Sequence, residues 1–118
     1  MRITEELIEV AEDSGEERAL EPPPDKTVAR ISYEILIENP YRYTEKEFFH
    51  ELHIVRRNKT DLKIETYDIR RSPLLKDFGW GFHRNKEGRL ALVAVESDKY
   101  QELQKSIKRT RAYRKSRR

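Results

Sequence analysis

The chain has 118 residues, of which 36% are hydrophobic and 40% are charged, and it contains no cysteine. This length predicts a single domain with a small core. The lack of cysteine excludes disulfide bonds, thiolate metal sites and a cysteine nucleophile. The acidic N-terminus lacks the apolar run of a signal peptide, and no window approaches the roughly 18 apolar residues of a membrane helix, so we expect a cytoplasmic protein.

The net charge of +3 is distributed unevenly along the chain. Residues 1–38 hold eleven acids and four bases, and residues 39–103 are nearly balanced. Residues 104–118 hold eight bases and no acid. The high isoelectric point therefore belongs to the C-terminal tail, and it does not indicate a basic face on the domain.

The first 38 residues contain two segments whose apolar spacing fits either a helix or a strand. In residues 3–11, Leu7 and Ala11 share a helical face, whereas Ile8 and Val10 alternate as in a strand. Residues 27–37 show the same ambiguity, and their β-branched content favours a strand. Between them, residues 12–26 are acidic and include three consecutive prolines, which predict an extended loop.

Residues 44–57 carry the clearest helix signal. Thr44 and Glu47 have the spacing of a capping box, which satisfies two unpaired N–H groups at a helix start. Phe48, Leu52 and Val55 then follow at the spacing of an apolar stripe. We predict an amphipathic helix over these residues.

Two histidines of this helix, His50 and His53, raise the question of a metal site. Zinc proteases place two histidines at positions i and i+4, whereas these lie at i and i+3. A third ligand, such as His83, would have to come from elsewhere in the chain. We therefore predict histidines on the surface of the helix, and no bound metal or cofactor.

The second half of the chain predicts a short helix, a hairpin and a final helix. Ser72 and Pro73 have the pattern of an N-cap followed by the first helical position, which predicts a helical turn over residues 72–78. Residues 80–84 and 89–95 are predicted strands joined by a turn. The second strand is apolar on both faces, which indicates a central or doubly covered strand. Ser97 caps a helix predicted over residues 97–108.

Two segments together, ENPYRYTEKEFF and RRSPLLKDFGWGFHRNKEGRLALVAVESDKY, resemble a family of small proteins of unknown function that is found mainly in bacteria. The resemblance covers about residues 4–103 and implies no catalytic activity. It implies that residues 5–11 form a strand beside the hairpin and that residues 27–37 form a helix. The chain departs from the family pattern between Arg57 and Arg70, where it is shorter and lacks a cysteine. The matching residues are Asn39, Pro40, Tyr41, Tyr43, Thr44, Arg70 or Arg71, Ser72, Pro73, Leu74, Lys76, Phe78, Gly79, Trp80, Gly81, His83, Glu87, Gly88, Ala91 and Leu92.

We therefore predict a single α+β domain over residues 1–108. Its antiparallel sheet of about three strands packs against three to four helices, and residues 12–26 form a loop. Residues 109–118 form a basic tail that is too charged to pack and is expected to be disordered.

The best functional hypothesis from the sequence is a binding module with an anionic-ligand site around Trp80. Glycines flank this tryptophan, and they either let a ligand approach the indole or permit a tight turn over a core residue. Basic residues near it in sequence would suit a carboxylate or phosphate. The predicted ligand-binding residues are Arg71, Lys76, Trp80, His83 and Arg84.

The alternative hypothesis is nucleic-acid binding through the tail, where bases can neutralise phosphates and a tyrosine can stack. Its sharper form is a winged-helix arrangement, with helices over 27–37, 44–57 and roughly 66–78 and the 80–95 hairpin as the wing. The acidic first third of the chain argues against it. The residues of this prediction are Lys108, Arg109, Arg111, Tyr113, Arg114 and Lys115.

The sequence offers no catalytic motif. Ser72 and Ser97 lie at predicted helix caps, and neither lies in the G-x-S-x-G pattern of a nucleophile elbow. The glycines around Trp80 do not have the spacing of a phosphate-binding loop. We lean towards a protein that is not an enzyme.

Overall fold

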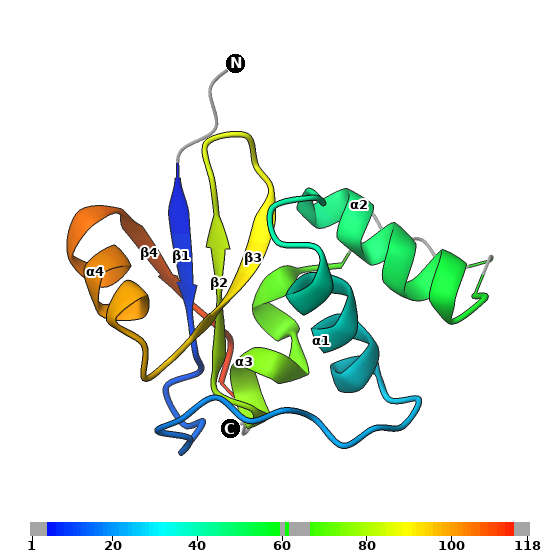
Figure 1. The fold of residues 1–118 in the computed structure, drawn as a ribbon, viewed down its shortest axis with the longest axis horizontal. Coiled ribbons are helices and arrows are strands. Elements are labelled where there is room, and N and C mark those ends of the chain that lie inside the picture. Colours follow the sequence, from blue (N-terminus) through cyan, green and yellow to red (C-terminus); the bar gives the residue numbers. More distant parts are fainter. Residues whose placement is uncertain (1–4, 60, 62–66, 115–118) are drawn as a thin grey trace.

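The structure is a computed structural model that describes residues 5–59, 61 and 67–114. Along the chain it has β1 (Glu6–Glu9), α1 (Val28–Glu38), α2 (Glu45–Phe49), the π-helical segment η1 (His50–Arg56), the 3₁₀ turn η3 (Ile69–Arg71), α3 (Pro73–Asp77), β2 (Trp80–Arg84), β3 (Leu90–Ala94), α4 (Asp98–Ser106) and β4 (Lys108–Arg111). Figure 1 shows the sheet with α4 on one side and the other helices on the opposite side.

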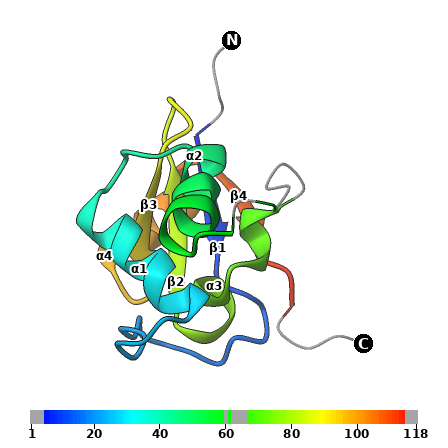
Figure 2. The ribbon, with the colours of Figure 1, turned by 90° about the vertical axis from the view of Figure 1, so that its right-hand side faces the viewer.

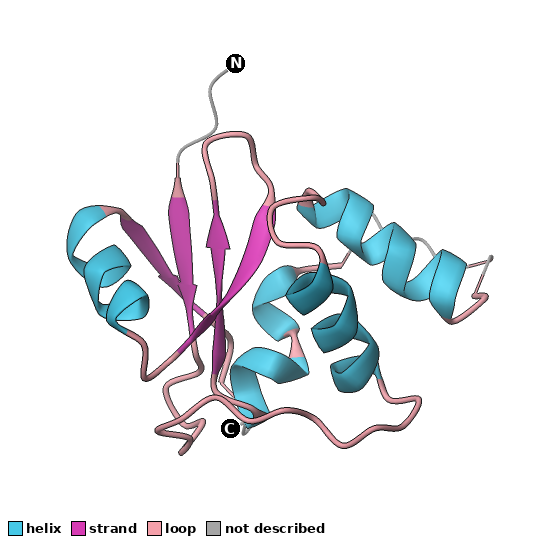
Figure 3. Ribbon diagram, in the orientation of Figure 1, coloured by secondary structure: helices cyan, strands magenta, loops and turns pink. Residues whose placement is uncertain are grey.

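The four strands form one mixed sheet in the order β3-β2-β1-β4. β1 is antiparallel to β2 and parallel to β4, and β2 is antiparallel to β3. Figure 3 shows how this sheet lies between the two helical layers. The predicted α+β class is confirmed, and both ambiguous N-terminal segments take the form that the family resemblance implies: a strand first and then a helix.

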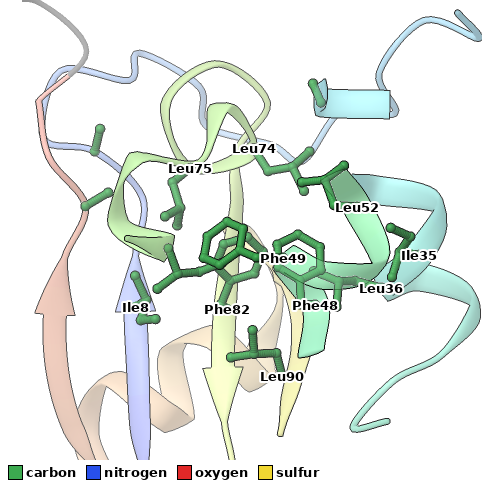
Figure 4. Packing of buried hydrophobic residues seen from close by; sticks show 14 residues of the cluster. Ile8, Ile35, Leu36, Phe48, Phe49, Leu52, Leu74, Leu75, Phe82 and Leu90 are labelled. Carbon is green, nitrogen blue, oxygen red and sulfur yellow. The ribbon is translucent and has the colours of Figure 1, made fainter. Parts of the chain in front are cut away.

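The register of the strands assigns their side chains to two cores. Ile8 pairs with Phe82, which pairs with Leu92, and all three face α1, α2 and α3. Leu7 and Val93 face the opposite way and pack with Tyr100 and Leu103 of α4. Because side chains alternate along a strand, β1 and β3 each contribute to both cores. Figure 4 shows the larger core, in which Phe48, Phe49 and Leu52 pack over the sheet.

The predicted caps form as expected. The Thr44 side chain accepts from the N–H of Glu47, and the Glu47 carboxylate accepts from the N–H of Thr44. Ser72 caps α3, whose first residue is Pro73. Ser97 caps α4 through the N–H of Tyr100. Local sequence therefore determines where three of the helices begin.

The basic C-terminal segment departs from prediction, because residues 108–111 form strand β4 and the helix before it ends at Ser106. The acidic first strand neutralises the basic one: Arg109 and Arg111 lie 3.9 and 3.6 Å from the Glu9 carboxylate. Ala112 is buried and donates its N–H to the Glu9 carbonyl at 3.0 Å. The sheet thus has four strands, one pair of them parallel, rather than three antiparallel strands. Residues 115–118 lie outside the described part of the chain.

Of the two alternatives predicted for the second strand of the hairpin, the doubly covered one holds: β3 is covered on both faces and lies at the edge of the sheet. The winged-helix arrangement needs correction. The hairpin does not project as a wing, because β2 lies between β1 and β3. Over residues 67–78 the expected third helix is split into η3 and α3. The winged-helix arrangement is therefore wrong for this chain.

Candidate functional site

A cleft of about 530 Å³ opens between α1, the continuous α2–η1 helix and the η3–α3 segment. Figure 2 shows α1 and α2 from the side, in front of the sheet. Ligand pockets are commonly concave, largely apolar and a few hundred Å³ in volume. The cleft is lined by Val28, Ser32, Phe48, Phe49, Leu52, His53, Tyr67, Asp68, Arg71, Ser72 and Pro73.

The floor of the cleft comes from the apolar stripe of the α2–η1 helix. Phe48 and Leu52 are four residues apart, so both point to the same side of the helix, where they are almost fully buried. Phe49 lies beside them, with its ring centroid 5.2 Å from that of Phe48. The helix changes from α-helical to π-helical turns at His50, and Leu52 and His53 of the π-helical segment line the cleft. π-Helical segments of this kind often occur at functional sites.

Three rings form an aromatic wall. Phe49 and His53 stack nearly parallel at 6.0 Å, and Tyr67 meets both edge-on, at 5.6 Å from Phe49 and 4.8 Å from His53. Edge-to-face and offset contacts of this kind are the favourable geometries for aromatic pairs. The wall therefore offers a preformed surface for an aromatic or aliphatic group.

His53 is the titratable group of this wall. Burial lowers its pKa below 6.5, and the neighbouring Arg57 guanidinium lowers it further. A guanidinium nitrogen of Arg57 lies 2.5 Å from Nδ1 of His53. Since arginine can only donate, Nδ1 must accept, and the neutral ring carries its proton on Nε2. The wall is thus uncharged at neutral pH.

The mouth of the cleft carries the charged groups. Arg71 is exposed, and its guanidinium lies over the Tyr113 ring at 5.1 Å. Asp68 also lines the cleft, and it caps η3 by accepting the N–H of Arg70 at 2.9 Å. A guanidinium that stacks on a ring presents its N–H groups around its edge, where they can bind a carboxylate. The cleft can therefore bind an apolar group inside and an acidic group at its mouth.

The five residues of the predicted Trp80 site do not form one site. Arg71 lines the cleft, Lys76 lies in α3, and Trp80, His83 and Arg84 lie in β2. The Trp80 indole N–H donates to the carbonyl of Leu20 at 2.9 Å, and its ring meets Tyr33 at 5.7 Å. The tryptophan therefore connects the acidic loop, through Leu20, and α1, through Tyr33, to the end of the sheet.

Each glycine beside Trp80 has a packing reason. Gly79 has a φ of +73°, and a Cβ there would lie 2.5 Å from the carbonyl oxygen of Arg18. A Cβ on Gly81 would lie 2.7 Å from the Tyr100 ring and 3.0 Å from the carbonyl oxygen of Ile8. These close approaches account for both glycines without a ligand.

The remaining two predicted residues point to opposite faces of the sheet, because they are adjacent in a strand. His83 lies on the α4 face, between Glu5 and Tyr41. Arg84 lies on the other face and pairs with Glu6 and Glu45. Their charges are thus matched by partners within the domain.

The residues of the predicted nucleic-acid site lie at the β4 edge of the sheet. Lys108, Arg109 and Arg111 are in β4, and Arg114 follows it. Tyr113 lies beneath Arg70 at 4.2 Å. Lys115 lies outside the described residues. Lys108, Arg109 and Arg111 thus lie along an edge strand of the sheet, and Tyr113 contacts Arg71, which lines the cleft.

The three histidines do not converge. His50 and His53 lie on η1, whereas His83 lies on the far face of the sheet. Among the described residues, no group of three His, Asp or Glu side chains is placed to hold a metal ion.

The cleft itself was missed by sequence reasoning. Its walls come from positions as distant as Val28 and Pro73, and only tertiary packing brings them together. One signal was available, because His53 falls on the apolar side of its helix, where an exposed histidine would not be expected. The loop that carries Tyr67 gave no such signal.

These features define a small α+β domain with a helix-lined cleft and a basic strand edge. Over residues 1–118 the chain belongs to the family described as "Family of unknown function (DUF6157)". No curated protein and no solved structure matches the chain significantly. Within the part of the chain that the structure describes, no helix has both the length and the apolar character needed to cross a membrane.

Proposed function

We propose that this protein is a binding module for a small, largely apolar molecule that carries an acidic group. The observation that carries the proposal is the 530 Å³ cleft, whose aromatic wall lies within reach of an exposed arginine. We still expect an anionic ligand, as the sequence suggested, but we now propose that it binds in the cleft and not around Trp80. Arg71 is the predicted residue common to both places.

The acidic group follows from the charges at the mouth. His53 is held neutral, so Arg71 supplies the positive charge among the lining residues. The carboxylate of Asp68 is already bound to a backbone N–H and helps to hold η3. A ligand carboxylate could therefore bind the edge of the Arg71 guanidinium in a bidentate manner.

A direct test uses 1-naphthoate and the uncharged 1-naphthalenemethanol, with binding followed by two-dimensional NMR. We expect both compounds to change the chemical shifts of Phe49, His53 and Tyr67. The acid should bind more tightly than the alcohol. Arg71→Ala should remove most of the preference for the acid and leave binding of the alcohol unchanged. A loss of one charge-assisted bond corresponds to roughly a tenfold weakening.

Lys86→Ala is the matched control, because it removes one positive charge from the exposed β2–β3 turn. It should leave the preference for the acid intact. If neither compound shifts the cleft residues at millimolar concentration, or if Arg71→Ala and Lys86→Ala behave alike, the proposal is wrong.

Nucleic-acid binding is a second candidate, favoured by the exposed basic side chains along β4. Because β4 belongs to the sheet, truncation would remove a strand as well as charge. The cleaner test is a gel shift with the double variant Lys108→Ala, Arg114→Ala, neither of which pairs with Glu9. Phosphate contacts should make binding fall steeply with salt and weaken it in this variant. Unchanged binding would exclude the edge as the contact surface.

A further inference from the structure

Outside the cleft, four polar side chains form an unbroken hydrogen-bonded chain on the α4 face of the sheet. Glu5 Oε2 lies 2.6 Å from His83 Nε2, and His83 Nδ1 lies 2.7 Å from the Tyr41 hydroxyl. Lys99 Nζ lies 3.0 Å from the same hydroxyl. The chain thus links a carboxylate, an imidazole, a phenol and an ammonium group in that order.

The fold brings these groups together from four separate segments. Glu5 precedes β1, and Leu7, two residues later on the same face, pairs with His83. Tyr41 follows α1 and is held by its N–H bond to the carbonyl of Leu90 at 2.9 Å. Lys99 belongs to the first turn of α4. His83 is buried, Tyr41 is half-buried and Lys99 is exposed, so the phenol lies where a buried base meets the solvent.

The positions of the protons follow from donor and acceptor chemistry. The Glu5 carboxylate accepts, so His83 Nε2 carries a proton, and when this is the only proton on the ring nitrogens Nδ1 accepts. The Tyr41 hydroxyl therefore donates to Nδ1, and its oxygen accepts from Lys99. In this state the His83 Nε2–H, the Tyr41 O–H and one N–H of Lys99 each have an acceptor, and the phenol proton points at a base.

The same framework also suits the state after proton transfer. If the phenol proton moves to Nδ1, the imidazolium lies between the Glu5 carboxylate and a Tyr41 phenolate. The phenolate oxygen would then accept from both His83 and Lys99, and each charge would lie beside an opposite one. No atom needs to move by more than the length of the proton transfer.

The backbone at Tyr41 is strained, with a φ of +59°. L-residues rarely adopt this conformation, and glycine or asparagine would adopt it more readily. Residues held in such conformations cluster at functional sites. In this conformation the Tyr41 ring meets the His83 ring edge-on, with ring centroids 5.4 Å apart.

We propose that Tyr41 is a base-activated nucleophile for electrophilic acyl compounds, with His83 as its base, Glu5 as the group that orients the base, and Lys99 as the cation beside the oxygen. This is the logic of a nucleophile–histidine–carboxylate triad, which is recognised by geometry and not by sequence order. In the step, Tyr41 Oη attacks the acyl carbon and its proton passes to His83 Nδ1. The bond between the acyl carbon and the leaving oxygen then breaks, and that oxygen takes the bonding electron pair and the proton from His83, so that it departs as an alcohol or phenol. The product is an acyl ester of Tyr41.

The experiment uses p-nitrophenyl acetate with the full chain. Tandem mass spectrometry locates the acetyl groups over time, and absorbance follows the released p-nitrophenolate. We expect Tyr41 to be acetylated roughly 100-fold faster than the exposed Tyr113, the lower end of what a positioned base contributes. His83→Gln should bring Tyr41 down to the rate of Tyr113, and Glu5→Gln and Lys99→Met should each slow it by a smaller factor.

Lys86→Met is the matched control, because Lys86 is an exposed lysine that forms none of the hydrogen bonds of this chain of side chains, and the substitution should leave the rate unchanged. Circular dichroism establishes that each variant is folded, and the Glu5 and Lys99 variants decide the question if His83→Gln does not fold. Equal acetylation of Tyr41 and Tyr113 in the wild type would overturn the proposal, as would an unchanged rate in the folded variants. Arg71→Ala should not alter this reaction, so its outcome is separate from that of the cleft.

Discussion

Gly81 lies directly against the ring of Tyr100, so that a Cβ on this glycine would stand 2.7 Å from Cε2 of the tyrosine. The Tyr100 hydroxyl in turn accepts the N–H of Val10 at 3.0 Å. A helix residue is thereby fixed to both β2 and the end of β1. The glycine allows α4 to lie this close to the sheet.

Gly81→Ala should therefore destabilise the protein. The added methyl group would overlap the ring edge and the carbonyl oxygen of Ile8, and overpacking of this kind costs roughly 1–3 kcal/mol. Chemical denaturation at pH 7 measures the loss. Gly81→Ala combined with Tyr100→Leu should lose less than the sum of the two single variants, because the smaller side chain relieves part of the overlap.

Gly15→Ala is the comparison for backbone strain alone. This glycine also has a positive φ, of +75°, but nothing lies within 4 Å of a Cβ placed there. Gly15→Ala should lower the free energy of unfolding by about 1 kcal/mol, whether or not Tyr100 is also replaced. Strict additivity of the Gly81 and Tyr100 substitutions would contradict the packing explanation.

Arg84 is expected to matter because it joins two carboxylates on the opposite face of the sheet. It lies 2.7 Å from Glu6 and also binds Glu45, whose pKa is raised by burial and lowered in part by this arginine. Arg84→Met should cost roughly 2–4 kcal/mol, since it leaves a mostly buried carboxylate without its cation. The pKa of Glu45 should rise further, so the loss should be smaller at pH 5 than at pH 7.

The Arg56–Glu51 pair provides the control for this prediction. Its atoms are 2.9 Å apart, but Arg56 binds one carboxylate and is itself more exposed than Arg84, which binds two. Arg56→Met should change the free energy of unfolding by no more than about 0.5 kcal/mol. If Arg84→Met and Arg56→Met lowered the free energy of unfolding equally, the partly buried Arg84 network would add no more stability than an ordinary surface ion pair.

Much of the fold could be predicted because it depends on neighbours in sequence. The capping box at Thr44, the Ser72–Pro73 helix start and the Asn85–Gly88 turn each need groups only a few residues apart. Thr44→Ala should accordingly lower the free energy of unfolding by about 1 kcal/mol, whereas the exposed helix position Lys46→Ala should be nearly neutral. Equal effects of the two substitutions would argue against the cap.

β4 could not be predicted, for a physical reason. The segment KRTR has no apolar face, and its stability as a strand comes from β1, about 100 residues earlier in the chain. The Thr110 hydroxyl binds Glu6, and the neighbouring arginines lie beside Glu9. Composition gave the correct sign of charge at each end of the chain, but it could not show that the two ends pair.

The candidate sites were harder still to predict. The sequence drew attention to His83 because it lies close to Trp80, whereas its partners are Glu5 and Tyr41, 78 and 42 residues away. The neighbours of Trp80 in space, Leu20 and Tyr33, show that it fastens the loop. Closeness in sequence along a strand was misleading, because adjacent residues point to opposite faces.

His53 gives the pH dependence of stability a defined sign. Burial and Arg57 hold its pKa in the folded protein below the ordinary 6.5, so between the two values the unfolded chain binds more protons than the folded one. The contribution of His53 to the free energy of unfolding must then fall as the pH falls below about 6.5. His53→Phe keeps an aromatic ring in the wall and removes the titrating group, so its stability should fall less over the same range.

Thermal unfolding of both proteins at pH 7.0, 6.0 and 5.5 measures the difference. Between pH 7.0 and 5.5, the unfolding temperature of the wild type should fall by more than that of His53→Phe. His50→Phe is the matched control, because His50 is exposed on the same helix, and its curve should follow the wild type. Parallel curves for the wild type and His53→Phe would show that His53 is protonated as readily in the folded protein as in the unfolded chain. The cleft wall would then be cationic in acid, and the dependence of ligand binding on Arg71 alone would be lost at the same pH.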